Sequence, residues 1–99
     1  MVFANTTISI NLKMKYYKRQ WNEIRGDECD DWGTSIWYFE IDEKGYPNKQ
    51  IEKYESGIVL KYDDENSEDK FGRLSDQPID LQDFQEFEIT KEEFDKEWK

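Results

Sequence analysis

The amino-acid sequence predicts an α+β fold, with a twisted antiparallel sheet of four to five strands and a short C-terminal helix packed on it. Three observations lead to this prediction. Apolar residues occupy alternate positions near the N-terminus, aromatic and β-branched runs in the middle of the chain are separated by glycine-containing turns, and the C-terminus has the period of a helix. A chain of 99 residues has the length of one compact domain, so we expect residues 1–99 to form a single domain.

The composition favours a folded chain over a disordered one. Charged residues make up 38% of the sequence and hydrophobic residues only 35%, which raises the question of disorder. Aromatic residues, however, make up 16% of the sequence, and each large ring buries on the order of 150 to 250 Å² in a core. We therefore expect a small aromatic core beneath a strongly solvated surface.

The first strand is predicted from Thr6 to Tyr16, where apolar and polar residues alternate with the period of a half-buried strand. The alternating apolar residues are Ile8, Ile10, Leu12, Met14 and Tyr16. Met14 is an alternative start to Met1, which would make residues 1–13 an N-terminal extension. Because the alternation continues through Met14, we expect this extension to form a strand with either start.

Three further strands are predicted over residues 34–42, 49–55 and 58–63. The first of them is dense in aromatic and β-branched residues and ends at Glu43-Lys44-Gly45, a turn signal with a glycine available for positive φ. Glu55-Ser56-Gly57 suits a short hairpin between the other two. We expect three consecutive antiparallel strands here, with Phe71–Leu74 adding a short piece.

The C-terminal part of the chain carries two helix-start signals. Asp80 can cap a short turn over Leu81–Phe84. Thr90–Glu93 is a capping box, in which the Thr90 and Glu93 side chains each accept a hydrogen bond from the other residue's backbone N–H. Phe94 and Trp98 then lie on one face of a helix too short to be stable alone, so both rings are predicted to be buried against the sheet.

Composition also excludes several classes of function. The chain has no histidine and a single cysteine, Cys29, so it has no Ser-His-Asp or Cys-His catalysis, no histidine or four-cysteine zinc site and no internal disulfide. Its net charge of −10 argues against nucleic acid and anionic membranes as partners. No apolar run approaches the ~20 residues of a membrane helix, and the N-terminus does not resemble a secretory signal. We expect a cytoplasmic protein.

Two acidic segments are the candidate binding site. The candidate residues are Asp27, Glu28, Asp30, Asp31 and Trp32 in the first segment, and Asp63, Asp64, Glu65, Glu68 and Asp69 in the second. An exposed Trp32 beside four carboxylates is a plausible anchor for a protein partner, since Trp, Tyr and Arg dominate interface energetics. The alternatives are that Trp32 folds back over the sheet edge and that the acids are only solvated surface.

Calcium and catalysis are both disfavoured. The second acidic segment lacks the glycine and the final glutamate of a calcium-binding loop whether counting starts at Asp63 or at Asp64. With 24 acidic residues in the chain, no carboxylate pair is informative about acid–base catalysis. The acids around Cys29 disfavour its thiolate. We therefore expect binding rather than enzymatic activity, with no metal and no cofactor.

From Met14 onward the order of features resembles a family of small bacterial proteins that carry a domain of unknown function. The resemblance is carried by Lys15-Tyr16-Tyr17-Lys18 with Trp21, Tyr38-Phe39-Glu40-Ile41-Asp42 with Gly45, Gln50-Ile51-Glu52-Lys53-Tyr54 with Gly57, and Phe87-Glu88-Ile89-Thr90-Lys91-Glu92-Glu93-Phe94 with Trp98. The chain departs from that pattern in its 13-residue N-terminal extension and in a longer acidic insertion around Asp27 to Trp32.

Proteins of that kind resemble the immunity proteins of polymorphic toxin systems, which bind a secreted toxin and protect the cell that makes it. The resemblance implies a protein partner, a toxin domain with a basic cleft, and favours a nuclease. An acidic inhibitor would gain association rate from electrostatic steering towards such a cleft. The alternative is an acidic nucleic-acid mimic, encoded by a phage or plasmid, that inhibits a host defence protein.

Overall fold

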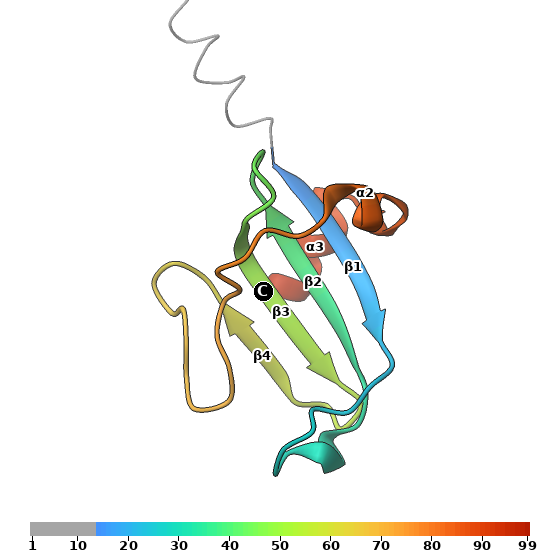
Figure 1. The fold of residues 1–99 in the computed structure, drawn as a ribbon, viewed down its shortest axis with the longest axis vertical. Helices are drawn as coiled ribbons and strands as arrows, with labels where there is room; N and C mark the ends of the chain where they lie inside the picture. Colours follow the sequence, from blue (N-terminus) through green and yellow to red (C-terminus); the bar gives the residue numbers. More distant parts are fainter. Residues whose placement is uncertain (1–13) are drawn as a thin grey trace, which may run out of the picture.

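A computed structural model describes residues 14–99 and has the predicted α+β architecture (Figure 1). The strands are β1 (Lys15–Trp21), β2 (Ser35–Ile41), β3 (Pro47–Tyr54), β4 (Val59–Tyr62) and β5 (Glu88–Ile89). They form one antiparallel sheet in the order β4-β3-β2-β1-β5. The helical elements are the 3₁₀ turns η1 (Asp30–Trp32) and η2 (Gln85–Phe87) and the α-helices α2 (Leu81–Phe84) and α3 (Lys91–Trp98).

The first strand differs from the prediction. The extension over residues 1–13 lies outside the described residues, and β1 continues to Trp21, five residues beyond the predicted end at Tyr16. Tyr16 and Tyr17 are both buried, although their side chains point to opposite faces of the sheet. An alternating sequence pattern predicts only a strand with one buried face. Because both faces of β1 are covered, its residues after Tyr16 do not alternate and the pattern did not include them.

The two predicted hairpin turns are confirmed. Gly45 and Gly57 have φ values of 94° and 98°, and their N–H groups donate to Asp42 and Tyr54 carbonyls at 3.0 and 2.9 Å. These positive φ values suit glycine because it has no Cβ. The predicted short piece over Phe71–Leu74 is limited to one isolated bridge, between Glu68 and Arg73.

The sheet is covered on both faces, and Figure 1 shows α3 behind it and α2 with the long loops in front. On the α3 face, the fully buried Phe94 packs with Tyr16, Tyr38 and Ile51. The opposite face, here called the loop face, carries two separate clusters. One is formed by Tyr17, Phe39, Ile41, Trp37, Ile79 and Phe84, and the other by Tyr54, Leu60, Tyr62, Trp32, Ile58, Phe71 and Leu74.

The helix-start predictions are confirmed for Asp80 and in part for Thr90. The Asp80 side chain accepts hydrogen bonds from two backbone N–H groups of α2. Thr90 Oγ1 accepts from Glu93 N at 3.1 Å, as a capping box requires, but the Glu93 carboxylate lies 3.8 Å from Lys18 Nζ. Lys18 on β1 therefore attracts the side chain that was predicted to complete the box. Among residues 14–99, no helix is long and apolar enough to cross a membrane.

The prediction that Trp98 is buried holds only in part. Its ring stacks on Phe94 with centroids 6.1 Å apart and an angle of 16° between the planes, but Trp98 itself is half-buried. Lys49 Nζ lies 5.1 Å from the ring centroid on the side of β3. Trp98 is at the last turn of α3, where the helix end leaves part of the indole in solvent.

Candidate functional site

In the first acidic segment, two carboxylates stabilise the segment itself. Asp27 accepts from Arg25 Nε at 3.0 Å and from Cys29 N at 2.8 Å. Asp30 accepts from Asp27 N at 2.9 Å. Cys29 is buried, and this burial together with the Asp27 charge raises the pKa of its thiol. Glu28 is exposed, as is Asp31, so these two remain available to a partner.

In the second acidic segment, too, some carboxylates form hydrogen bonds within the chain and others are exposed. Asp63 accepts from Glu65 N and Asn66 N at 3.0 and 2.9 Å. Asp69 accepts from the Tyr62 hydroxyl at 2.9 Å and from two backbone N–H groups. Asp64, Glu65 and Glu68 are exposed. Within residues 14–99, no group of three or more candidate ligands is placed to hold a metal ion.

Trp32 folds back onto the sheet instead of projecting towards solvent. Its ring centroid lies 5.2 Å from that of Tyr54 and 5.1 Å from that of Phe71, and the Arg25 guanidinium lies 5.2 Å from it. The contact between Trp32 and Phe71 brings the end of the second acidic segment to η1. The start of that segment, Asp63 to Glu65, lines a different hollow together with Lys49. Asp27 of the first segment lines the hollow around Glu52 instead, so the ten predicted residues do not share one hollow.

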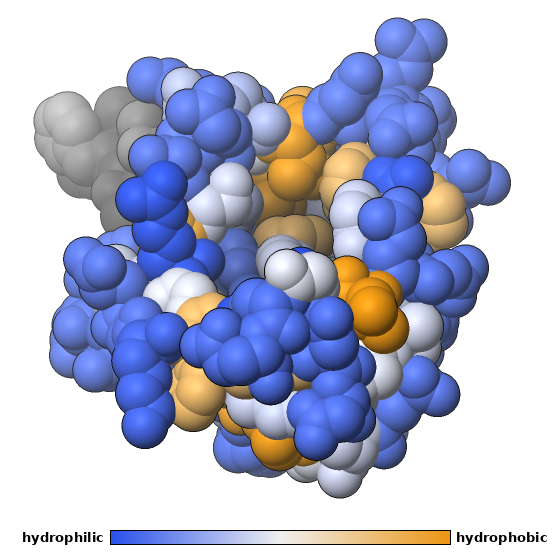
Figure 2. Space-filling model, turned by 60° about the horizontal axis from the view of Figure 1, so that its bottom comes forward, coloured by the Kyte–Doolittle hydropathy of each residue, from blue (hydrophilic) through white to orange (hydrophobic). Residues whose placement is uncertain are grey.

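A groove on the loop face, between the two clusters, is the stronger candidate site. It consists of two adjoining hollows that share Trp21 and Trp37 and is here called the central groove. The apolar hollow, of about 290 Å³, is lined by Arg19, Trp21, Trp37, Phe39 and Phe84. The polar hollow, of about 300 Å³, is lined by Trp21, Glu23, Ile24, Arg25, Asp27, Ser35, Trp37, Glu52, Tyr54, Phe71, Gly72 and Arg73. Figure 2 shows hydrophobic residues around a hollow in an otherwise largely hydrophilic surface.

Strand register places the aromatic residues of the groove side by side. Arg19 and Trp21 of β1 pair with Trp37 and Ser35 of β2, and Trp37 pairs with Glu52 of β3, so all five side chains project from the loop face. Trp21 and Trp37 have ring centroids 6.4 Å apart. Trp21 remains 47% exposed, a large fraction for an indole. The groove therefore presents one exposed ring, Trp21, beside the half-buried rings of Trp37 and Phe84 and the buried ring of Phe39.

Glu52 lies at the base of the polar hollow and is 4% exposed. Its carboxylate accepts from the Tyr54 hydroxyl at 2.6 Å and from Gln50 Nε2 at 2.9 Å, and Arg25 Nη1 lies 3.9 Å away. Burial raises the pKa of Glu52, because it penalises the charged form more than these contacts favour it. Burial, followed by the hydrogen bond to Glu52, raises the pKa of Tyr54 to about 12, so its hydroxyl remains a donor.

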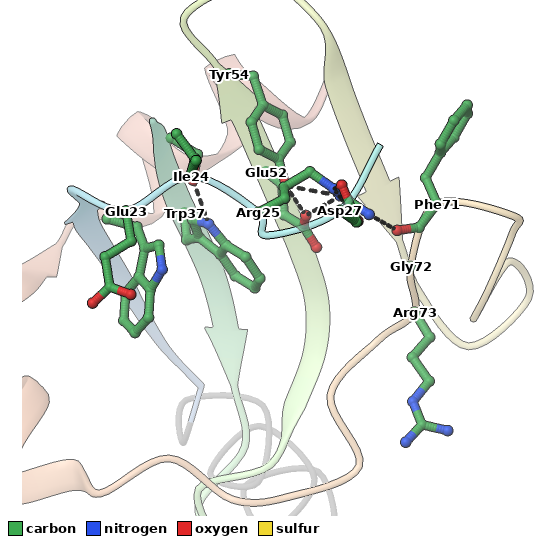
Figure 3. A pocket seen from close by; sticks show the side chains of 12 residues that line it. Glu23, Ile24, Arg25, Asp27, Trp37, Glu52, Tyr54, Phe71, Gly72 and Arg73 are labelled. Carbon is green, nitrogen blue, oxygen red and sulfur yellow. Dashed lines mark hydrogen bonds and ion pairs between the residues drawn. The ribbon is translucent and has the colours of Figure 1, made fainter. Parts of the chain in front are cut away.

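Arg25 joins the two loops that form the rim of the polar hollow. In Figure 3 its guanidinium points towards Glu52 and Asp27 and towards the Phe71 carbonyl, to which it donates. It also donates to the Tyr54 hydroxyl at 3.1 Å. These bonds are all within the chain, so Arg25 and Glu52 serve to hold the groove in shape. Among residues 14–99, Trp21 is 47% exposed and Glu23 has no ion-pair partner, so these two are the side chains of the groove that are open to a partner.

Sequence reasoning did not include Trp21 or Trp37 among the candidate residues. Trp37 lies within the strand predicted over residues 34–42, and Trp21 enters only through the family resemblance. The two indoles become neighbours only through the pairing of β1 with β2, and a single sequence does not show which strands pair. Comparison of the chain with family models, curated proteins and solved structures gives no match. The resemblance to immunity-like proteins therefore stays a prediction.

Proposed function

We propose that this protein is an immunity protein, which binds and neutralises a cognate bacterial toxin, a nuclease, by stoichiometric inhibition. The observation that carries the proposal is the central groove, an aromatic-lined hollow with the exposed Trp21 at its side, on a chain of net charge −10. Interface hot spots are enriched in Trp, Tyr and Arg, and Trp21, Trp37 and Arg19 line this groove. A binding surface of this kind supports a protein partner.

The charge of the chain supports a basic partner. The acidic residues of the candidate segments that are exposed, and that do not serve as hydrogen-bond acceptors for their own loop, are Glu28, Asp31, Asp64, Glu65 and Glu68. Together with the net charge of −10 they give a negative field, which speeds the approach of a positively charged protein. A nuclease cleft is basic because it binds phosphates, so an acidic inhibitor is complementary to it.

The experiment that tests the proposal is capture of the partner followed by measurement of inhibition. The tagged protein would be expressed in its native host, and co-purifying proteins identified by mass spectrometry. We expect a toxin domain that forms a one-to-one complex and loses its nuclease activity at one equivalent of this protein. Trp21→Ala should weaken inhibition, whereas Tyr46→Ala, of similar exposure but outside the groove, should leave it unchanged.

Two outcomes would contradict the proposal. A captured host defence or restriction protein, inhibited at one equivalent, would favour the nucleic-acid mimic instead. Release of a product by this protein alone, in the absence of any partner, would indicate an enzyme. Gene neighbourhood gives an independent check, since a large toxin gene immediately upstream favours immunity and a phage early operon favours the mimic.

A further inference from the structure

We infer that the central groove receives a lysine or arginine side chain of the partner protein, whose aliphatic part lies along the rings of Trp21 and Trp37. The inference rests on the proposed function only in taking the partner to be a protein. The occupant itself follows from the aromatic surfaces, the charges and the size of the groove.

On the loop face, arginine side chains already lie close to aromatic rings on both sides of the groove. The Arg19 guanidinium lies 4.8 Å from the ring centroids of Phe84 and of Phe87. On the other side, the Arg25 guanidinium lies 5.2 Å from the Trp32 ring. Cations within about 6 Å of a ring face are attracted by its quadrupole, and Trp is the best such ring.

Trp21 and Trp37 lie between these two arginines, and neither indole has a cation over it among residues 14–99. An incoming lysine or arginine would give these two rings the partner that their neighbours on the same face already have. Such side chains are suited to the groove because their methylene groups pack on apolar surface while the charged end stays hydrated or paired.

The charges around the groove also favour a cation. Arg19 is paired with Asp83 at 3.0 Å, and Arg25 is placed between the carboxylates of Asp27 and Glu52. Glu23 lines the polar hollow, and its carboxylate has no ion-pair partner among the residues that the structure describes.

Arg73 does not offset this excess of negative charge. Its side chain points away from the hollow in Figure 3, is 69% exposed and lies 3.9 Å from Asp76. With Arg73 directed away, the groove holds three carboxylates and two arginines, which favours a cationic occupant over an anionic one.

The size of the groove limits the occupant to one or two side chains. Its two hollows measure about 290 and 300 Å³, at the lower end of the roughly 300 to 1,000 Å³ typical of small-molecule sites. A long side chain can enter the apolar hollow along the two indoles and direct its charged end towards Glu23 and the polar hollow.

The test uses short peptides as probes and the four indole N–H groups as reporters. The ¹⁵N-labelled protein would be titrated with acetyl-Gly-Arg-Gly-amide and with its Lys, Leu and Glu analogues, and the indole signals followed by NMR. We expect the Trp21 and Trp37 signals to shift with the Arg and Lys peptides, while Trp98 on the α3 face stays unchanged.

Two matched variants make the test specific. Glu23→Gln should raise the Kd for the Arg peptide about three- to tenfold, whereas Glu92→Gln, an exposed acid of α3 on the opposite face of the sheet, should leave it unchanged. Equal shifts with the Leu peptide would overturn the inference, as would the absence of any shift at tens of millimolar peptide. Indole shifts that depend on protein concentration alone would instead identify a second copy of this chain as the occupant.

The outcome separates this inference from the proposed function. If the Trp21→Ala and Glu23→Gln variants capture and inhibit the toxin like the parent protein, the groove is not the contact surface but the inhibitor role stands. If the Arg peptide binds as expected and no toxin is captured, the groove is a cation-binding site on a protein with another partner.

Discussion

At the scale of single residues, Arg25 and Glu52 give the loop face its shape. Glu52 comes from β3 at the base of the polar hollow, and Arg25 reaches it from the long connection after β1. Through Arg25 this connection is tied to Phe71 in the loop after β4. Two loops far apart in sequence are therefore held together by one guanidinium, beside a carboxylate that is almost inaccessible to water.

Glu52→Gln should reduce the pH dependence of stability. The pKa of Glu52 is raised above its ordinary value of 4.5, so its contribution to stability is complete below that pH and is lost as the pH rises through the folded-state pKa. As the pH rises from 4 to 8, the parent should therefore lose about 1.4 kcal/mol of unfolding free energy for each unit by which that pKa is raised. The variant has no carboxylate at this position and should not show this loss. Urea unfolding between pH 4 and 8 measures this. A difference that is constant with pH would show that the pKa is not raised.

Arg25→Ala should lower the free energy of unfolding by about 2 to 4 kcal/mol, because it removes four polar contacts and leaves the buried Glu52 charge without its cation. The control is Arg73→Ala, since the Arg73 side chain is 69% exposed and should change stability by no more than about 0.5 kcal/mol. Thermal or urea unfolding of both variants gives the comparison. Similar values for the two would show that Arg25 does not hold the loops.

At the scale of the elements, α3 is stabilised by the sheet and not by its own length. An isolated helix shorter than about 12 residues is marginal in water, and α3 has eight. Its stability comes from Phe94, which is 0% exposed and lies with its ring centroid 5.3 Å from that of Tyr16 on β1. The Thr90 cap satisfies one N–H at its start. α3 therefore forms together with the sheet.

Phe94→Ala should cost about 3 to 5 kcal/mol, the usual range for deleting a buried aromatic ring. Trp98→Ala should cost less than Phe94→Ala because part of its indole stays in water. Leu81→Ala, 40% exposed on α2, is the control and should change little. The melting temperature should be lowest for Phe94→Ala, higher for Trp98→Ala and highest for Leu81→Ala. A melting temperature of Phe94→Ala equal to that of Leu81→Ala would mean that α3 is not needed for the fold.

At the scale of the whole molecule, a net charge of −10 on 99 residues dominates the long-range field. The five exposed acids of the two segments contribute to this field, while Asp27, Asp30, Asp63 and Asp69 also accept hydrogen bonds from backbone N–H groups. The two segments reach different parts of the surface. For the proposed basic partner, we expect these acids to act through steering during approach and the central groove to make the short-range contact.

Neutralising only the exposed acids of the second segment should slow association without unfolding the protein. The triple variant Asp64→Asn, Glu65→Gln and Glu68→Gln keeps the loop hydrogen bonds of Asp63 and Asp69. The association rate constant with the captured toxin should fall about three- to tenfold at low salt, with little change in dissociation. Stopped-flow mixing measures both rates.

Added salt is the control for this prediction. At 1 M salt, where the Debye length is about 3 Å, the association rates of parent and triple variant should converge. A difference that persists at high salt would indicate that these acids contact the partner directly instead of steering it.

The sequence by itself determined the features that depend on neighbours along the chain. The turns at Gly45 and Gly57 and the caps at Asp80 and Thr90 are each specified within about four residues, and all four are present. Strand and helix periods then sufficed for the α+β class. Local backbone preference and local hydrogen bonding act in the same way whatever the rest of the chain does.

Only the tertiary structure decided which residues are buried and which remain open. Trp32 packs between Tyr54 and Phe71, so the anchor expected in the first acidic segment is turned inwards. Trp21 and Trp37 are adjacent because β1 pairs with β2, and Glu52 is buried because two distant loops close over it. Each of these outcomes depends on contacts between residues far apart in sequence, whose pairing is selected by the packing of the whole core and leaves no period in the local sequence.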